Sequence, residues 1–130
     1  MKDYPLKDRK ILVVEDDFSG TIYLNRILEQ KGAVILNAVS GLEAVNKVRE
    51  NPDIDLVLMD IQLPVMDGYK ATFEIRQFRP NLIIIAQTAY DRAEDNQILT
   101  ESGFDDYITK PILGDELIRK LISFLPKIIL

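Results

Sequence analysis

The sequence predicts a doubly wound α/β domain, a parallel sheet covered by helices on both faces. Two observations favour this fold class. Five short apolar segments rich in β-branched residues recur along the chain, and each is followed by a segment with helical periodicity. A chain of 130 residues also suits one domain with a single core. We therefore expect residues 1–130 to form one domain, with a core spanning about residues 10–125.

The predicted strands are the five apolar segments, at residues 10–14, 34–39, 55–59, 82–87 and 106–109. The first, third and fourth are almost continuously hydrophobic, as is typical of strands buried on both faces of a parallel sheet.

The predicted helices occupy residues 18–31, 41–50, 69–78, 91–101 and a final segment around 117–122. Three carry apolar residues along one side, namely Leu24, Ile27 and Leu28, then Leu42, Val45 and Val48, and in the last segment Leu117, Ile118, Leu121 and Ile122. The side of the third helix is more mixed, with Tyr69, Thr72, Phe73, Ile75 and Arg76. The fourth helix is the most polar, with Ile98 and Leu99 as its apolar residues, which indicates either loose packing or a surface reserved for another interaction.

Capping signals agree with these boundaries. Capping boxes are expected at residues 40–43 and 91–94. Gly32 and Gly103 follow the first and fourth helical patterns, where a C-terminal glycine belongs.

Composition excludes several classes of function. The net charge of −5 argues against a nucleic-acid-binding surface, and the absence of cysteine and histidine removes disulfides, thiol catalysis and the commonest general base. No apolar run is long enough to span a bilayer, and residues 1–10 lack the apolar core of a signal peptide. We therefore expect a cytoplasmic protein, or the cytoplasmic part of a larger membrane-anchored one.

Polar residues follow four of the five strands: Glu15-Asp16-Asp17, Asp60, Thr88-Ala89, and Thr109-Lys110-Pro111. The second strand is followed only by helix-capping chemistry. In an open parallel sheet, ligands bind outside the carboxyl ends of the strands. Strand order 2-1-3-4-5, with the second strand at the border, would account for this distribution.

Each of these residues has a simpler interpretation when it is considered alone. Asp17 suits the N-cap of the first helix, and a single lysine is usually a solvated surface charge. Together, however, three carboxylates at one edge would repel one another unless a hard cation such as Mg²⁺ or Mn²⁺ joined them. A lysine opposite them suggests an anion. The combination indicates phosphoryl transfer to Asp60, whose carboxylate needs no general base at neutral pH.

Asp67 is the second aspartate of the segment LVLMDIQLPVMDG. It precedes Gly68 and is interpreted as the N-cap of the third helix, with Pro64 bending the loop before it.

Four segments, VVEDD, MDIQLPVMDG, AQTA and DYITKP, resemble in order and spacing the signature motifs of receiver domains of two-component response regulators. The resemblance covers about residues 10–125. It implies a flavodoxin-like (βα)5 fold with strand order 2-1-3-4-5.

The resemblance also implies roles for individual residues. Glu15 and Asp16 match the acidic pair that holds Mg²⁺, with Asp17 outside that pair. Asp60 matches the phosphoacceptor, which also touches the metal, and Gln62 matches the position whose backbone carbonyl is a metal ligand.

At the other side of the site, Thr88 matches the switch hydroxyl and Ala89 the small residue that leaves room for the phosphoryl group. Tyr107 matches the switch aromatic, and Lys110 the phosphate-pairing lysine, followed by a cis bond to Pro111. The lifetime of the phosphoryl group is expected to depend on two variable positions, Gln62 and Tyr90.

The phosphoryl donor implied by the resemblance is a phosphohistidine of a histidine kinase or phosphotransfer protein. The sequence around the motifs is most similar to receivers of hybrid sensor histidine kinases. Such a domain is a signalling phosphoacceptor rather than an enzyme, although it promotes its own phosphorylation and dephosphorylation. Phosphorylation is expected to alter the surface around the fourth helix and fifth strand, and the resemblance also allows a phosphorylation-dependent dimer.

The main alternative is a receiver-like interaction module that is not phosphorylated, against which the complete set of polar residues argues. A haloacid-dehalogenase-like phosphatase would need a second aspartate two residues after Asp60, where Gln62 stands. A nucleotide-binding fold is disfavoured because neither phosphate-binding glycine motif is present.

Overall fold

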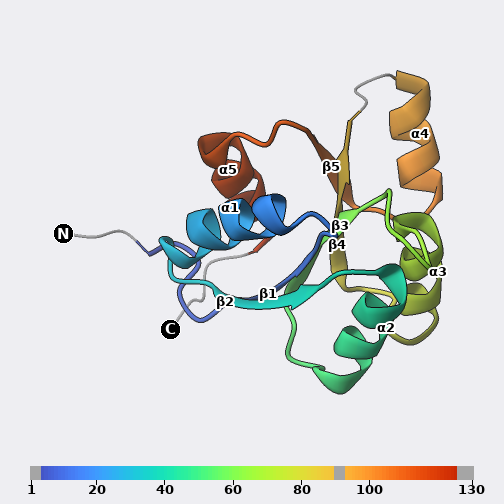
Figure 1. The fold of residues 1–130 in the computed structure, drawn as a ribbon, viewed down its shortest axis with the longest axis horizontal. Coiled ribbons are helices and arrows are strands. Elements are labelled where there is room, and N and C mark those ends of the chain that lie inside the picture. Colours follow the sequence, from blue (N-terminus) through green and yellow to red (C-terminus); the bar gives the residue numbers. More distant parts are fainter. Residues whose placement is uncertain (1–3, 90–92, 126–130) are drawn as a thin grey trace.

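The computed structural model describes residues 4–89 and 93–125, which form a parallel sheet covered by helices on both faces (Figure 1). The strands are β1 (Lys10–Val14), β2 (Val34–Ala38), β3 (Leu56–Asp60), β4 (Ile83–Thr88) and β5 (Asp106–Thr109). The helices are α1 (Phe18–Glu29), α2 (Gly41–Glu50), α3 (Gly68–Phe78), α4 (Ala93–Glu101) and α5 (Gly114–Phe124). The predicted alternation of strands and helices is confirmed.

The strand order is β2-β1-β3-β4-β5, and every pair of neighbours is parallel. This order confirms the prediction and places β2, which is more exposed than β1 and β3, at one border. The chain changes its direction of winding between β1 and β3, so the carboxyl ends of these two strands form the topological switch point of the sheet.

The sheet separates two hydrophobic cores (Figure 1). Alternate residues of a strand point to opposite faces, so β1 and β3 contribute to both. One core lies under α1 and α5 and includes Ile11, Val13, Leu56, Leu58, Leu28 and Leu121. The other lies under α2, α3 and α4 and includes Leu12, Val14, Val57, Met59, Val48 and Ile75. The continuous apolar character of β1, β3 and β4 follows from this burial on both faces.

Side chains cap three helices by accepting a hydrogen bond from a backbone N–H three residues later: Asp17 from Gly20, Ser40 from Glu43 and Asp67 from Lys70. The predicted N-cap roles of Asp17 and Asp67 are therefore confirmed. At α2 the Glu43 carboxylate accepts the N–H of Val39 rather than that of Ser40, one residue earlier than a capping box requires. The second predicted box, at 91–94, includes residues outside the described ranges.

Gly32 and Gly103 adopt positive φ angles of 94° and 99° at the ends of α1 and α4. The residue after each glycine donates its N–H to a carbonyl five residues earlier, 3.2 Å away, which is the Schellman arrangement. The predicted glycine caps are confirmed.

The apolar sides of some helices differ from expectation. Leu42 was expected on the buried side of α2 but is 46% exposed, and Ala44 is buried there together with Val45. The first turn of α2 packs against the loop before α3, where the Gly41 N–H donates to the Met66 carbonyl, so this turn buries the glycine. The expected apolar residues Phe73, Ile98 and Ile122 are also exposed. Among the described residues, no helix combines the length and apolar character needed to cross a membrane.

Candidate functional site

The carboxyl edge of the sheet gathers the polar residues that the sequence placed after its strands. Glu15 follows β1, Asp60 ends β3, Thr88 ends β4 and Lys110 follows β5. Because all strands are parallel, these four positions meet at one edge. The predicted convergence is confirmed, and β2 supplies only the Ser40 cap there.

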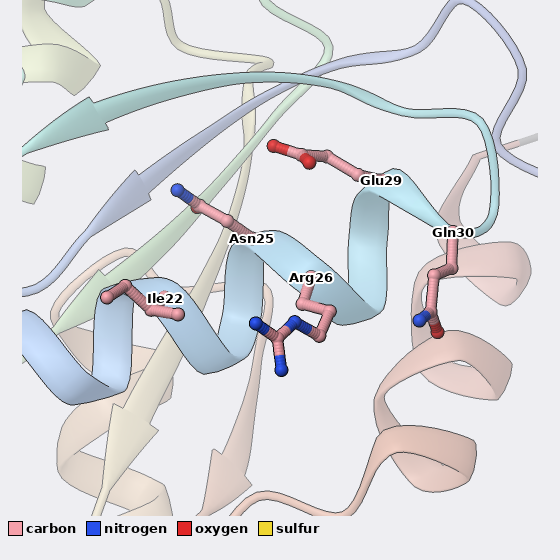
Figure 2. Close-up of a pocket in the computed structure, with 5 residues that line it drawn as sticks. All are labelled: Ile22, Asn25, Arg26, Glu29 and Gln30. Carbon is pink, nitrogen blue, oxygen red and sulfur yellow. The ribbon is translucent and has the colours of Figure 1, made fainter.

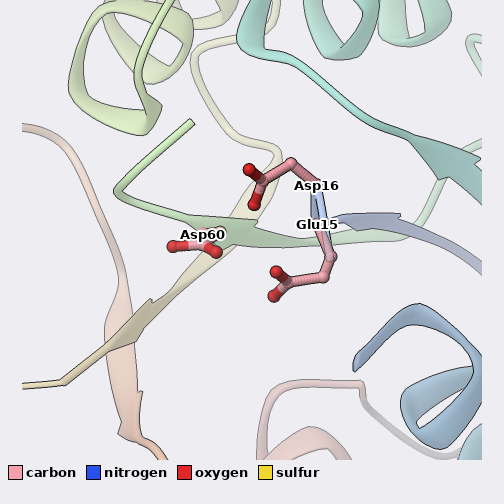
Figure 3. Close-up of side chains that lie close together, drawn as sticks. All are labelled: Glu15, Asp16 and Asp60. Carbon is pink, nitrogen blue, oxygen red and sulfur yellow. The ribbon is translucent and has the colours of Figure 1, made fainter. Parts of the chain in front are cut away.

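Three carboxylates form a cluster at the switch point. Glu15, Asp16 and Asp60 each offer a carboxylate oxygen, and these three atoms lie within 4.8 Å of one another. Figure 3 shows the Glu15 and Asp16 side chains leaving adjacent positions and facing Asp60 across a common space. Glu15 and Asp60 are only 4% and 3% exposed, whereas Asp16 is exposed to solvent.

Lys110 is the cation nearest to two of these acids. Its Nζ lies 2.9 Å from Oδ2 of Asp60 and 3.4 Å from Oε2 of Glu15. Burial acts to lower the pKa of the Lys110 ammonium, but the hydrogen bond and charge of Asp60, together with the charge of Glu15, outweigh burial and raise it. Lys110 therefore remains protonated at neutral pH and partly neutralises the cluster.

The environment of Glu15 disfavours its charged form. Burial raises the pKa of the Glu15 carboxyl, and the negative charge of Asp60 raises it further. Lys110 and the N–H of Asp17, which lies 3.2 Å from Oε1 of Glu15, offset part of this effect. A cation that enters the cluster would therefore stabilise the charged form of Glu15.

Both oxygens of Asp60 have partners. Oδ2 accepts from Lys110, and Oδ1 accepts the backbone N–H of Gln62 at 3.0 Å. The Gln62 side chain is exposed to solvent. The carboxylate of Asp60 is thus held in one orientation by groups from two different loops.

The cluster has the donor chemistry of a magnesium site. One ammonium faces three carboxylates, so negative charge remains in excess, and the donors are all oxygens. Hard divalent cations with oxygen ligands, Mg²⁺ or Mn²⁺, suit such a set.

The predicted switch residues lie on or directly after β4 and β5. Thr88 is 1% exposed and its carbonyl accepts the N–H of Lys110 at 2.8 Å, whereas Ala89 is exposed. Tyr107 is half-buried, and its hydroxyl accepts a hydrogen bond from Nδ2 of Asn96 at 3.0 Å. The peptide bond before Pro111 is cis, as expected. Tyr90, predicted to tune the site, lies outside the described residues.

Two polar residues near the site were not anticipated. Asn96 contacts Tyr107 from α4, and Gln87 is fully buried in β4 beside Asp60 in the strand register. Gln87 had a signal in the sequence, because it interrupts an otherwise apolar strand. Asn96 had none, since a polar residue in a polar helix is unremarkable.

A cavity of about 420 Å³ adjoins the cluster on the side of α1 and α5, and its lining includes Glu15, Gln87 and Lys110. A second surface hollow of about 420 Å³ lies along α1, lined by Ile22, Asn25, Arg26, Glu29 and Gln30 (Figure 2). Of the two, only the first includes residues of the acidic cluster and its lysine.

Comparison with known proteins agrees with this geometry. Residues 11–122 match the response regulator receiver domain family. Over 120 residues the chain is 36% identical to the sensor histidine kinase GacS of Pseudomonas protegens. That segment covers 88% of this chain and only 13% of GacS, so the chain corresponds to a small part of this relative.

Two solved structures extend the comparison. The receiver domain of the sensor histidine kinase PA1611 from Pseudomonas aeruginosa, with a magnesium ion coordinated in its active-site cleft, has a TM-score of 0.82 and 34% identity, covering 90% of this chain and 97% of that one. The co-crystal structure of the Saccharomyces cerevisiae phosphotransfer protein Ypd1 with the receiver domain of Ssk1 contains a chain with a TM-score of 0.86 and 30% identity, covering 92% of this chain and 90% of that one.

The family match covers nearly the whole sheet and all residues of the acidic cluster, and the solved relatives share the fold. Similarity to receivers of sensor histidine kinases and an acidic site that fits magnesium point to the same conclusion. The chain belongs to the receiver domain family of two-component response regulators.

Proposed function

We propose that this receiver domain accepts a phosphoryl group on Asp60. One observation carries the proposal: the buried Asp60 carboxylate lies at the switch point between Lys110 and the Gln62 N–H, with Glu15 and Asp16 within metal-ligand distance. A carboxylate held in one orientation beside a cation and other acids suits attack on a phosphoryl group.

The transfer forms a bond between an Asp60 carboxylate oxygen and phosphorus while the bond from phosphorus to the donor imidazole nitrogen breaks. The electron pair of the broken bond remains on that nitrogen. Lys110 would pair with a phosphoryl oxygen, and Thr88 would donate its hydroxyl to another. Magnesium held by Glu15, Asp16, Asp60 and the Gln62 carbonyl would supply positive charge to the transferring oxygens.

The signal would leave the site through β4, α4 and β5. Movement of the Thr88 side chain toward a phosphoryl group would open space that the Tyr107 ring could enter. Because the Tyr107 hydroxyl is bound by Asn96 of α4, this change would alter the surface around α4 and β5. Such a two-state shift requires only a few kcal/mol of differential contacts.

The donor would be a phosphohistidine of a histidine kinase or a phosphotransfer protein, as supported by the similarity to sensor kinase receivers and to a chain of the Ypd1–Ssk1 complex. The chain, taken as one domain from residue 1 to 130, would then serve as the receiver of a hybrid kinase or as a separate cytoplasmic regulator. Gln62 and Tyr90 would set the lifetime of the phosphoryl group. A receiver-like module without phosphorylation has no use for two buried acids that face one lysine at the edge of the sheet.

Intact mass spectrometry after incubation with Mg²⁺ and acetyl phosphate, or with a phosphohistidine donor, tests this proposal. The wild type should gain one acid-labile phosphoryl group. Asp60→Asn should gain none, whereas Asp67→Asn, which changes only the α3 cap, should behave as the wild type. Catalytic turnover of a phosphoester would indicate a phosphatase instead, and an unmodified wild type would indicate an interaction module.

A further inference from the structure

Gln87 makes an unusual contact across the sheet. Its side chain is fully buried, and Nε2 donates to the carbonyls of Val14 and Leu58, each at 3.3 Å. Leu58 belongs to β3, the neighbour of β4, and Val14 belongs to β1, one strand farther. A single carboxamide on β4 therefore contacts β3 and β1 together.

The two carbonyls lie directly beneath the acidic cluster. Val14 immediately precedes Glu15, and Leu58 is two residues before Asp60. Asp60 is also the register partner of Gln87 itself. The carboxamide therefore connects the ends of the two strands that carry the buried acids, and it lines the cavity that Glu15 also lines.

The contacts of the Gln87 side chain add little net stability to the folded protein. Oε1 of Gln87 is buried and accepts no hydrogen bond from the described residues, and an unsatisfied buried acceptor costs about 1–3 kcal/mol. Rotation of the carboxamide by half a turn would place Oε1 against the two carbonyl oxygens of Val14 and Leu58, so this orientation is the favourable one. An apolar side chain of the same length would remove this oxygen together with the two donated hydrogen bonds, whose contribution to stability is of similar size, about 0.5–1.5 kcal/mol each. What such a side chain could not replace is the connection of β1 to β3.

We infer that Gln87 is a positioning residue for the metal site: by tying Val14 to Leu58 it sets the spacing between Glu15 and Asp60. The inference rests on the proposed function of the cluster. Groups that orient metal ligands from behind typically change affinity about 10–100-fold when they are removed. The ligand of this site is a hard divalent cation, and loss of the Gln87 hydrogen bonds should lower the affinity of the site for that cation.

Gln87→Met tests this inference, because methionine keeps the length of the side chain and removes both donors. Isothermal titration with MgCl₂ should show a dissociation constant about tenfold larger than that of the wild type. Urea unfolding in EDTA should show stability equal to or above that of the wild type. In the same buffer, amide NMR signals of residues 14–16 and 58–60 should shift. The matched control is Ile85→Met, a buried position two residues earlier on β4, which should keep the wild-type magnesium affinity.

Three outcomes would overturn the inference. In the first, Gln87→Met binds magnesium with an affinity within twofold of that of the wild type. In the second, the wild type binds no magnesium. In the third, Gln87→Met and Ile85→Met both lose magnesium affinity in proportion to their loss of stability. If Gln87→Met does not fold, Gln87→Leu replaces it, and failure of both to fold would show a purely structural role. Phosphorylation of the wild type is scored separately, so loss of the proposed function is distinguishable from loss of this inference.

Discussion

Nζ of Lys110 lies 2.9 Å from Oδ2 of Asp60, although the two residues are fifty positions apart in the chain. The contact joins the loop after β5 to the end of β3 and places a cation on the carboxylate proposed to accept the phosphoryl group. Lys110 also reaches Glu15, at 3.4 Å, so one ammonium serves two buried acids. The residual negative charge sets the response of this site to pH, metal and mutation.

Glu15→Gln should stabilise the metal-free protein at neutral pH. Burial, followed by the charge of Asp60, raises the pKa of Glu15 in the folded state, so the folded chain binds this proton more tightly than the unfolded chain does. Stability therefore falls as pH rises from the ordinary glutamate value of about 4.3 through the raised folded pKa. In EDTA at pH 7 the variant should gain about 1 kcal/mol, because Lys110 offsets part of the repulsion between the acids.

Urea unfolding between pH 4 and pH 8 measures this difference, which should narrow toward zero at the acidic end. Asp16→Asn, at an exposed carboxylate of the same cluster, is the control and should change stability less. In excess MgCl₂ the order should reverse, because ligand binding stabilises the wild type by mass action. A gain that is constant across the pH range would contradict this explanation.

Lys110→Met should raise the pKa of Glu15 further, because the ammonium is the largest of the groups that lower it. Carboxyl ¹³C titration of Glu15 measures the change. Since the Lys110 side chain is 37% exposed, the loss of stability at neutral pH should stay below about 1 kcal/mol. In the wild type this stabilisation is present below the ordinary lysine pKa of about 10.4 and is lost as pH rises through the raised folded value.

Lys70→Met is the matched control for that experiment. Lys70 forms an ion pair with Glu74 on the surface of α3, 3.4 Å apart. Its removal should leave the titration of Glu15 unchanged, and an equal effect from both lysines would point to a general charge effect.

Asn96→Ala should shift the switch toward its phosphorylated form. The variant removes the 3.0 Å hydrogen bond that Asn96 donates to the Tyr107 hydroxyl, so the ring loses a contact that holds it at α4 in this structure. Amide NMR signals of residues 104–110 should move part of the way toward those of the wild type treated with an acyl-phosphate mimic. Gln97→Ala, which removes a hydrogen bond to Glu101 within α4, should not produce this shift.

Gly68→Ala should destabilise the protein more than Gly103→Ala. A Cβ atom at Gly68 would lie 2.3 Å from the backbone oxygen of Asp60, so the loop that holds this acid would have to move. At Gly103 the nearest atoms are 3.5 Å away, and the cost is that of a positive φ, about 1–2 kcal/mol. Thermal unfolding measures both costs, and Gly68→Ala should also weaken magnesium binding. Equal losses of stability would show that the contact with Asp60 is unimportant.

Much of the fold was predictable because it depends on local patterns. Continuous apolar runs identified β1, β3 and β4, and short-range signals such as Asp17, Asp67 and Gly32 marked helix ends. The prediction was wrong for Leu42, where contact of α2 with a neighbouring loop overrides the helical pattern. That loop is remote in sequence, and periodicity carries no information about it.

The sequence by itself determined which residues stand at the strand ends, and parallel strands then required Glu15, Asp60, Thr88 and Lys110 to share one edge. Tertiary structure alone decided how they interact: that two acids are buried while Asp16 is exposed, and that Lys110 lies on Asp60. It also decided that the carboxamide of β4 connects β1 to β3. These features arise from pairing between strands that are distant in the chain, where side-chain packing and electrostatics, rather than local backbone preference, set the distances.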